Sequence, residues 1–396
     1  MTATADAAGA PASLVDGARR IAAELGAAAP EGDELRRLPD AVWKRLLEDG
    51  FLRALQPARW GGGEVRYLEF VDAIMELSRV NPSAGWVAGV IGVHPWQLAL
   101  FDPRAQEELW GDEPTTMHSS SYNPTGTAEK VDGGYQVSGR WSFSSGCDHC
   151  RAVILGAVVA VADAPRPDFR SFLLLGDQYR IEDNWYVAGL KGTGSKDIVV
   201  APTFVPEHRT QSAYDYGMGA PLPGQVANDG PLYRLPWSVV FNMAIAASVL
   251  GSARGFIETW VEETTDRRAA GVGRLADDPF TQRRLAEAQW DLDAATALIR
   301  ADAETMWQMA EAHETATMAD RARMRWNMTR GCRRVGDAVT DLLRASSGRT
   351  VFIDHPLQRR FQDVQSGLAH AFLSPDPLAK AVGGGELGAT KPELVL

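Results

Sequence analysis

Three long helical segments in the second half of the chain constrain its fold most strongly. Apolar residues recur at helix-like spacing over 237–270, 280–314 and 317–348. Segments of about 25 to 35 residues are typical of bundles in which long antiparallel helices pack side by side. We therefore expect a C-terminal helical bundle over residues 236–396.

The middle of the chain has a different pattern. Between about residues 113 and 210, short runs of β-branched and aromatic residues are separated by Gly, Pro, Asp and Asn, which is typical of strands and turns. Strands without intervening helices favour a small antiparallel barrel or sandwich. The Gly- and Pro-rich stretch 211–235 fits neither neighbour, and we interpret it as a long loop of the kind that often forms a lid.

Helical spacing also dominates the first part of the chain, where we expect four or five helices between residue 14 and about residue 112. The sequence therefore predicts an α+β protein with an N-terminal α-helical domain at 1–112, a central β domain at 113–235, and a helical domain at 236–396. Residues 1–12 are expected to be a frayed tail.

Charge and cysteine content exclude several classes of protein. The 396 residues include 40 Lys and Arg against 51 Asp and Glu, a net charge of −11, which argues against general nucleic-acid binding. Three cysteines cannot build a disulfide framework, and they fit a reducing cytoplasm. We find no targeting segment and no uninterrupted apolar stretch of membrane-spanning length, so we expect a cytoplasmic protein without a membrane partner.

Most common catalytic motifs are absent, including a Walker loop, GxGxxG after a strand, HExxH and GxSxG. Cys147 and Cys150 form a CxxC with His149 inside it. Zinc needs about four ligands and no second pair stands at useful spacing, so we assign no metal site and favour buried structural thiols.

Three short segments combine small hydroxyls with turns or glycine: 119–121, 141–146 and 192–195. Hydroxyls and backbone amides of this kind suit the polar edge of a planar heteroaromatic cofactor, with aromatic side chains against its face. The alternative is that each segment is an ordinary turn. His370 is a fourth candidate, because its ordinary pKa lies near neutrality.

Several segments together resemble a known family. GLKGTGSKDIVV at 189–200, Arg267 to Gly271, and SSGRTVFIDHPLQRRFQDV at 346–364 resemble the acyl-CoA dehydrogenase fold. Within that fold, WSFSSGCDH at 141–149 and the late His370 followed by SPDP resemble the oxygenase components of two-component flavin-dependent monooxygenases. The similarity includes the hydroxylases of p-hydroxyphenylacetate and of a secosteroid phenol, and it extends from about residue 14 to 385.

The resemblance implies a homotetramer whose subunits have an N-terminal helical domain, a central β domain and a C-terminal four-helix bundle. Reduced flavin, usually FMNH2 and possibly reduced FAD, would come from a separate NAD(P)H:flavin reductase. It would bind between the β domain and the bundle, partly against a neighbouring subunit. Its reaction with O2 would give a C4a-hydroperoxyflavin that hydroxylates a small phenolic or polycyclic aromatic substrate.

The resemblance also assigns roles to individual residues of this sequence. It places Trp86 and Phe143 beside the flavin ring, and either Ser144 or Ser145 near its N5 atom. Catalytic roles fall on His370 beside the flavin, on His94 near the substrate phenol, and on Ser144. The remaining residues expected to contact flavin, its phosphate or the substrate are Ser120, Ser121, Arg267, Ser346, Ser347 and Ala371.

Alternatives remain at this point. His370 stands within one position of the catalytic Glu of several acyl-CoA dehydrogenases, so a desaturase would lack its usual base. An FAD-dependent acyl-CoA dehydrogenase, an N-hydroxylating monooxygenase of the same fold, and a non-catalytic scaffold are the competing interpretations. Gln362 replaces an Arg of the dehydrogenases, which puts any tetramer contact made by that Arg in doubt. The stretch 211–235 carries none of the motifs of this resemblance, so it does not identify the substrate.

Overall fold

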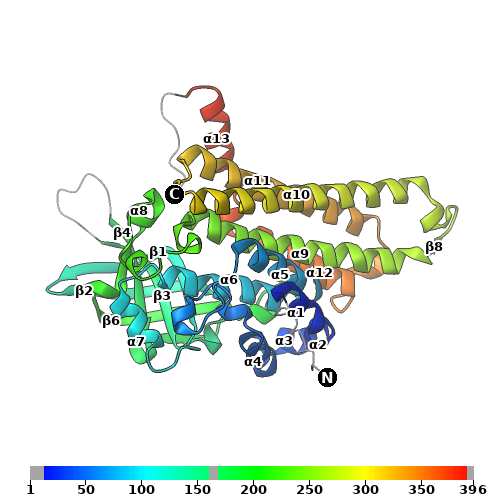
Figure 1. Cartoon of the computed structure of the whole chain (residues 1–396). Helices are drawn as coiled ribbons and strands as arrows, with labels where there is room; N and C mark the ends of the chain where they lie inside the picture. Colours follow the sequence, from blue (N-terminus) through cyan, green and yellow to red (C-terminus); the bar gives the residue numbers. More distant parts are fainter. Residues whose placement is uncertain (1–12, 160–167, 390–396) are drawn as a thin grey trace, which may run out of the picture.

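The computed structural model describes residues 13–159 and 168–389. The predicted frayed tail at 1–12 lies outside these ranges. Figure 1 shows the sheet at one end of the molecule and the long C-terminal helices extending away from it. Helices α5 and α6 lie between them, and α6 packs against both α9 and strand β1. The mixed α+β architecture predicted from the sequence is confirmed.

The first part of the chain forms seven α-helices instead of the predicted four or five. They are α1 (Leu14–Arg20), α2 (Ala22–Ala27), α3 (Ala29–Leu35), α4 (Asp40–Glu48), α5 (Tyr67–Val80), α6 (Pro82–Leu98) and α7 (Pro103–Trp110). The extra helices arise because backbone breaks at Ile21 and Ala28 divide the first helical stretch into three. The side chain of Asn81 accepts a hydrogen bond from the Ala84 amide at 3.0 Å and caps α6.

The central domain is one seven-stranded sheet of order β5-β6-β2-β1-β3-β4-β7. Its strands are β1 (His118–Val131), β2 (Gly134–Ser144), β3 (Ala152–Val159), β4 (Asp168–Leu175), β5 (Arg180–Glu182), β6 (Lys196–Pro206) and β7 (Thr210–Ser212). The expectation of a purely antiparallel arrangement is wrong in one respect, because β1 and β3 pair in parallel.

The sheet curls around its own core. In a flat sheet β2 and β4 would be about 14 Å apart, because β1 and β3 separate them. Yet the rings of Tyr135 on β2 and Phe172 on β4 have centroids 5.3 Å apart. Both rings belong to a buried cluster built from five strands, which also includes Trp141. The curl encloses an apolar interior like that of a barrel.

The stretch 211–235 is not the open loop that the sequence suggested. It contains helix α8 (Ala213–Met218) and two short 3-10 turns. The Asn228 amide donates to the Ala99 carbonyl at 2.7 Å, and Leu232 is 1% exposed. Its prolines and glycines therefore shape a segment that is anchored on the end of α6.

The C-terminal part contains three long helices and two shorter ones: α9 (Trp237–Thr265), α10 (Pro279–Glu311), α11 (Met318–Arg344), α12 (Pro356–Leu368) and α13 (Pro375–Glu386). A two-stranded hairpin of β8 (Arg268–Ala269) and β9 (Gly273–Arg274) follows α9. Within the described ranges, α9 alone is long and apolar enough to cross a membrane, but 94% of its most apolar window is buried in the protein. It is the central helix of the core.

Close packing of α9 against α5 gives a test of this core. A Cβ on Gly251 of α9 would lie 2.2 Å from the Met75 carbonyl oxygen of α5. We expect Gly251→Ala to lower the free energy of unfolding by about 1–3 kcal/mol, because two helix backbones must separate. Gly383→Ala in α13, where nothing lies within 4 Å, is the control and should be neutral or stabilising by up to about 1 kcal/mol. Equal urea midpoints for the two variants would contradict this packing.

Candidate active site

A continuous series of aromatic rings connects α6, β1, the start of α9 and the segment after α12. Trp86 lies 5.7 Å from His370, which lies 5.2 Å from Phe372. Phe372 is 6.1 Å from Trp237, which stacks on Phe241 at 4.3 Å. Phe241 in turn is 6.0 Å from the ring of His94. The structure thus brings both predicted histidines and Trp86 to one aromatic-walled region.

His94 is held in a defined tautomer. Its Nδ1 lies 2.9 Å from the His118 carbonyl oxygen, which only accepts hydrogen bonds, so Nδ1 carries the proton. Nε2 is therefore the acceptor for the Ser120 hydroxyl at 2.8 Å. Burial lowers the pKa of His94 to about 4, so the ring is neutral at ordinary pH. Ser120 is partly exposed, and its side chain also interacts with the Tyr122 hydroxyl.

His370 is also neutral, with the opposite tautomer. Its Nδ1 accepts the Phe372 amide at 3.1 Å, so the proton of the neutral ring is on Nε2. Burial lowers its pKa to about 4. A Cβ on Gly367 would lie 2.8 Å from Val249 and 3.3 Å from Trp86, so this glycine allows α12 to approach the Trp86 ring closely.

The strand end at Phe143 decides which serine faces the site. The pairing of β2 with β6 shifts between Trp141 and Ser144, and Phe143 has a φ of 68°, so a bulge reorients the chain. Ser144 then points inward, fully buried, and donates to Ser119 Oγ at 2.9 Å. These contacts do not test the catalytic role predicted for Ser144, which stays a prediction. Ser145 is the partly exposed serine that accepts from Trp86 Nε1 at 3.2 Å.

The other predicted residues of this region differ in their access. Phe143 is 70% exposed and makes an edge contact with Trp185 at 6.1 Å, so its ring is free to cover a ligand. Ala371 is exposed directly after His370. The Ser121 hydroxyl instead donates to the Ser142 carbonyl at 2.7 Å and is 8% exposed, which turns it away from the site.

Arg267, Ser346 and Ser347 lie at the other end of the molecule. Val249 of α9 lies beside Trp86, since a Cβ on Gly367 would contact both, and from Val249 the helix continues for about 25 Å to its end at Thr265, before the hairpin at β8. Arg267 donates to the Ala345 carbonyl at 2.9 Å there, and Trp260 donates to Ser346 Oγ at 3.1 Å. These three residues form a separate cluster about 25 Å from Trp86 of the same chain.

Several site residues were not predicted individually. Tyr122, Trp237, Phe241 and Phe372 form most of the wall, but aromatic residues at helix-like spacing look the same in any core. Thr193 and Ser195 lie in the segment 192–195 that the sequence did single out, and they form hydrogen bonds beside Ser145. The small hydroxyl side chains of this segment are the sequence signal that points to them.

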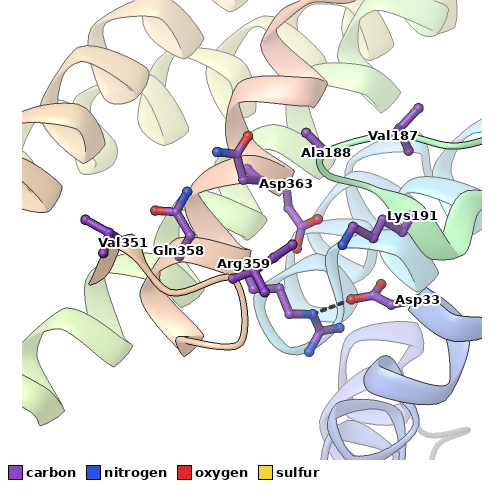
Figure 2. Close-up of a pocket in the computed structure, with 10 residues that line it drawn as sticks. Asp33, Val187, Ala188, Lys191, Val351, Gln358, Arg359 and Asp363 are labelled. Carbon is purple, nitrogen blue, oxygen red and sulfur yellow. Dashed lines mark hydrogen bonds and ion pairs between the residues drawn. The ribbon is translucent and has the colours of Figure 1, made fainter. Parts of the chain in front are cut away.

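Two cavities accompany the site. One of about 280 Å³ is lined by Tyr216 and Trp237 of the aromatic wall and by buried Arg321, so it adjoins the substrate side. The other, of about 340 Å³, is shown in Figure 2. It is bordered by Lys191 and Asp363, and Asp363 accepts the Leu190 amide at 2.6 Å.

The CxxC segment has no catalytic geometry. Burial raises the pKa of the Cys147 thiol to about 12, and it raises that of Cys150 well above the ordinary value. Both thiols are free. Across residues 13–159 and 168–389, no group of three or more His, Cys, Asp or Glu side chains is arranged to hold a metal ion.

Comparison with known proteins identifies the family. Residues 12–111 match the model of the acyl-CoA dehydrogenase N-terminal domain, and residues 243–375 match that of the C-terminal domain. The chain is 39% identical over 362 residues to the flavin-dependent monooxygenase oxygenase subunit HsaA of Rhodococcus jostii, covering 91% of this chain and 94% of that protein. The chain belongs to the oxygenase subunits of flavin-dependent monooxygenases. The family recognised from the sequence is confirmed.

Further relatives support this assignment. The oxygenase component of p-hydroxyphenylacetate 3-hydroxylase from Acinetobacter baumannii is 31% identical over 94% of this chain and 88% of its own. The crystal structure of 3-HSA hydroxylase from Rhodococcus sp. RHA1 has a TM-score of 0.91 and 36% identity, covering 97% of this chain and 99% of that one. The structure of XiaF from Streptomyces sp. with FADH2 and glycerol has a TM-score of 0.87 and 26% identity, covering 97% and 96%.

The residues of this oxygenase subunit fit a flavin. A flavin ring is flat, and its edge carries both donors and acceptors, so it needs aromatic faces together with polar atoms at the rim. Trp86 and the exposed Phe143 provide the faces. The partly exposed Ser145 oxygen and the Nε2 proton of His370 provide the acceptor and the donor.

The low pKa of His94 makes a prediction about acid stability. The unfolded histidine binds a proton near pH 6.5 and the folded one only near 4, so the unfolded state binds more protons between these values and stability falls as pH falls. His94→Asn keeps a donor for the His118 carbonyl but does not titrate. Between pH 6 and 4.5, the free energy of unfolding of the wild type should fall relative to the variant by about 1 kcal/mol per pH unit. Parallel denaturation curves across this range would show that the folded His94 titrates normally.

Proposed function

We propose that this oxygenase subunit uses reduced flavin and O2 to hydroxylate a phenolic ring, and that Ser120 and His94 hold the phenol oxygen. The observation that carries this proposal is the hydrogen-bond order from Ser120 Oγ to His94 Nε2, fixed by the His118 carbonyl behind His94. The Ser120 hydroxyl donates its proton to His94 Nε2, so Ser120 Oγ can only accept a hydrogen bond from a ligand. A phenol O–H is the matching donor.

This pair makes the ring more reactive without a strong base. The neutral His94 accepts the Ser120 proton, and Ser120 accepts the phenol proton, so electron density moves toward the phenol oxygen and its ortho carbon. Burial keeps the pKa of His94 near 4, so a positive charge on His94 is unfavourable. Complete proton transfer to His94 therefore requires a compensating negative charge on the phenol oxygen. Tyr122 stays neutral beside it, since burial raises its pKa well above the usual value.

Reduced flavin supplies the two electrons with which one oxygen atom of O2 enters the ring and the other leaves as water. His370 and Trp86 meet at 5.7 Å on the flavin side of the aromatic wall, where the Nε2 proton of His370 can be donated to an oxygen atom. The 280 Å³ cavity beside Trp237 gives an aromatic substrate room to enter.

Removal of the Ser120 hydroxyl tests the role of the pair. In Ser120→Ala, hydroxylation should fall by about 10²–10⁴-fold because the phenol loses its acceptor, while oxidation of reduced flavin by O2 continues and releases H2O2. Product and H2O2 are measured separately with chemically reduced flavin and a panel of phenols. Ser252→Ala removes another buried hydroxyl, which donates to Ser248 O at 2.7 Å, and should leave the ratio of product to H2O2 unchanged. An unchanged ratio in Ser120→Ala would refute the assignment.

A second copy of the chain completes the site in this proposal. Arg267, Ser346 and Ser347 suit a flavin phosphate but are about 25 Å from Trp86 of their own chain. Exposed apolar residues follow them, Val351 at 77%, Phe352 at 62% and Ile353 at 80%, as expected of a surface that another subunit covers. We propose a homotetramer in the cytoplasm, supplied with reduced FMN or FAD by a separate NAD(P)H:flavin reductase.

Hybrid oligomers test this shared site. Arg267→Ala and Ser145→Ala should each abolish efficient hydroxylation alone. Coexpressed, they should restore activity to about one site in four, because random pairing places an intact Arg267 opposite an intact Ser145 in that fraction of sites. Differently tagged copies allow the hybrids to be purified and assayed. Hybrids no more active than the parents would place both residues in one chain's site.

The rival chemistry on this fold is acyl-CoA dehydrogenation. That reaction needs a carboxylate base, whereas the neutral His370 with a pKa near 4 is a poor one. The desaturase would bind FAD tightly as the yellow oxidised form, whereas the oxygenase subunit should purify colourless. N-hydroxylation would appear in the same product panel as an oxidised amine instead of a catechol.

A further inference from the structure

A chain of hydroxyl groups extends from the predicted flavin side into the β domain. Trp86 Nε1 donates to Ser145 Oγ at 3.2 Å, and Ser145 Oγ lies 2.7 Å from Ser195 Oγ. Ser195 Oγ lies 2.7 Å from Thr193 Oγ1, which donates to the Leu190 carbonyl oxygen at 2.9 Å. Ser195 and Thr193 are 5% and 1% exposed, so water does not interrupt the chain.

Both ends of this chain impose the same direction on its protons. An indole N–H only donates, and a backbone carbonyl only accepts. The Thr193 hydroxyl donates its proton to the Leu190 carbonyl oxygen, so Thr193 Oγ1 accepts the proton of Ser195. Ser195 Oγ therefore accepts the proton of Ser145. The proton of Ser145 thus points into the protein, and its oxygen already accepts from Trp86. Only a lone pair of Ser145 remains for a ligand.

The anchor of the chain is rigid. Leu190 has a φ of 53°, and its amide donates to the buried Asp363 carboxylate at 2.6 Å. Its carbonyl also accepts from Trp185 Nε1 at 3.2 Å. Because Leu190 is held at its amide by the buried Asp363 carboxylate, and at its carbonyl oxygen by Trp185 Nε1 and by the Thr193 amide at 3.2 Å, this oxygen stays directed at the Thr193 hydroxyl. The direction of the hydroxyl chain is therefore built into the fold.

We infer that Ser195 and Thr193 are positioning residues that make the site select reduced over oxidised flavin. The N5 atom of a reduced flavin carries a proton and needs an acceptor, whereas N5 of an oxidised flavin has a lone pair and needs a donor. A Ser145 oxygen with its proton locked inward accepts from the first and repels the second. This inference rests on the proposed binding of flavin beside Trp86 and Ser145.

Equilibrium binding of both redox states tests the inference without turnover. Dissociation constants of FMN and FAD, each oxidised and each photoreduced without O2, are measured for the wild type and for Ser195→Ala and Thr193→Val. In either variant the Ser145 proton is free to turn toward N5, so the ratio of oxidised to reduced dissociation constants should fall on the order of 5- to 10-fold. Thr193→Ser keeps the hydroxyl and should retain the wild-type ratio.

The controls separate the possible failures. Ser252→Ala removes a buried hydroxyl of α9 that lies outside the chain and should leave the ratio unchanged. If the wild type binds neither redox state of either flavin, the proposed function itself fails. If the wild type prefers reduced flavin and both Ser195→Ala and Thr193→Val keep that preference, the flavin site stands and the selection by Ser195 and Thr193 is refuted.

Discussion

The burial of helix α9 against its neighbours is the constraint on which the rest of the structure depends. Its start contributes Trp237 and Phe241 to the aromatic wall, and its middle contacts α5 and α6 so closely that glycines are required. The Ser248 hydroxyl, which lies 3.1 Å from the Ala244 carbonyl of its own helix, is also 3.5 Å from the Gly85 carbonyl of α6, beside Trp86. The positions of Trp86 and His94 on α6 are therefore set by the helix that supplies the opposite wall.

Backbone carbonyls set the chemistry of both polar ends of the site. The His118 carbonyl fixes the tautomer of His94 and makes Ser120 an acceptor toward substrate. The Leu190 carbonyl, acting through Thr193, makes Ser145 an acceptor as well. A backbone carbonyl oxygen can only accept hydrogen bonds, so in each case it decides whether the serine donates to a ligand or accepts from it. Ser120 and Ser145 therefore both present an acceptor to a ligand.

The sequence predicted the division into helical, β and helical parts because periodicity reports which face of an element is buried. Resemblance placed Trp86, His94 and His370 in one site, and the structure brings them together. The choice between Ser144 and Ser145 could not be made, because it depends on a bulge with a positive φ at Phe143. The distance of Arg267 from the site also required the structure, since sequence spacing does not show where the far end of α9 lies.

The most direct measurement is the origin of the oxygen atom in the product. The purified oxygenase subunit is mixed with chemically reduced flavin, a phenol and ¹⁸O2, with no reductase present, and the product is analysed by mass spectrometry. We expect a ring hydroxyl that carries one ¹⁸O atom. A product whose new oxygen comes from water, or a desaturated product without new oxygen, would contradict monooxygenase chemistry at this site.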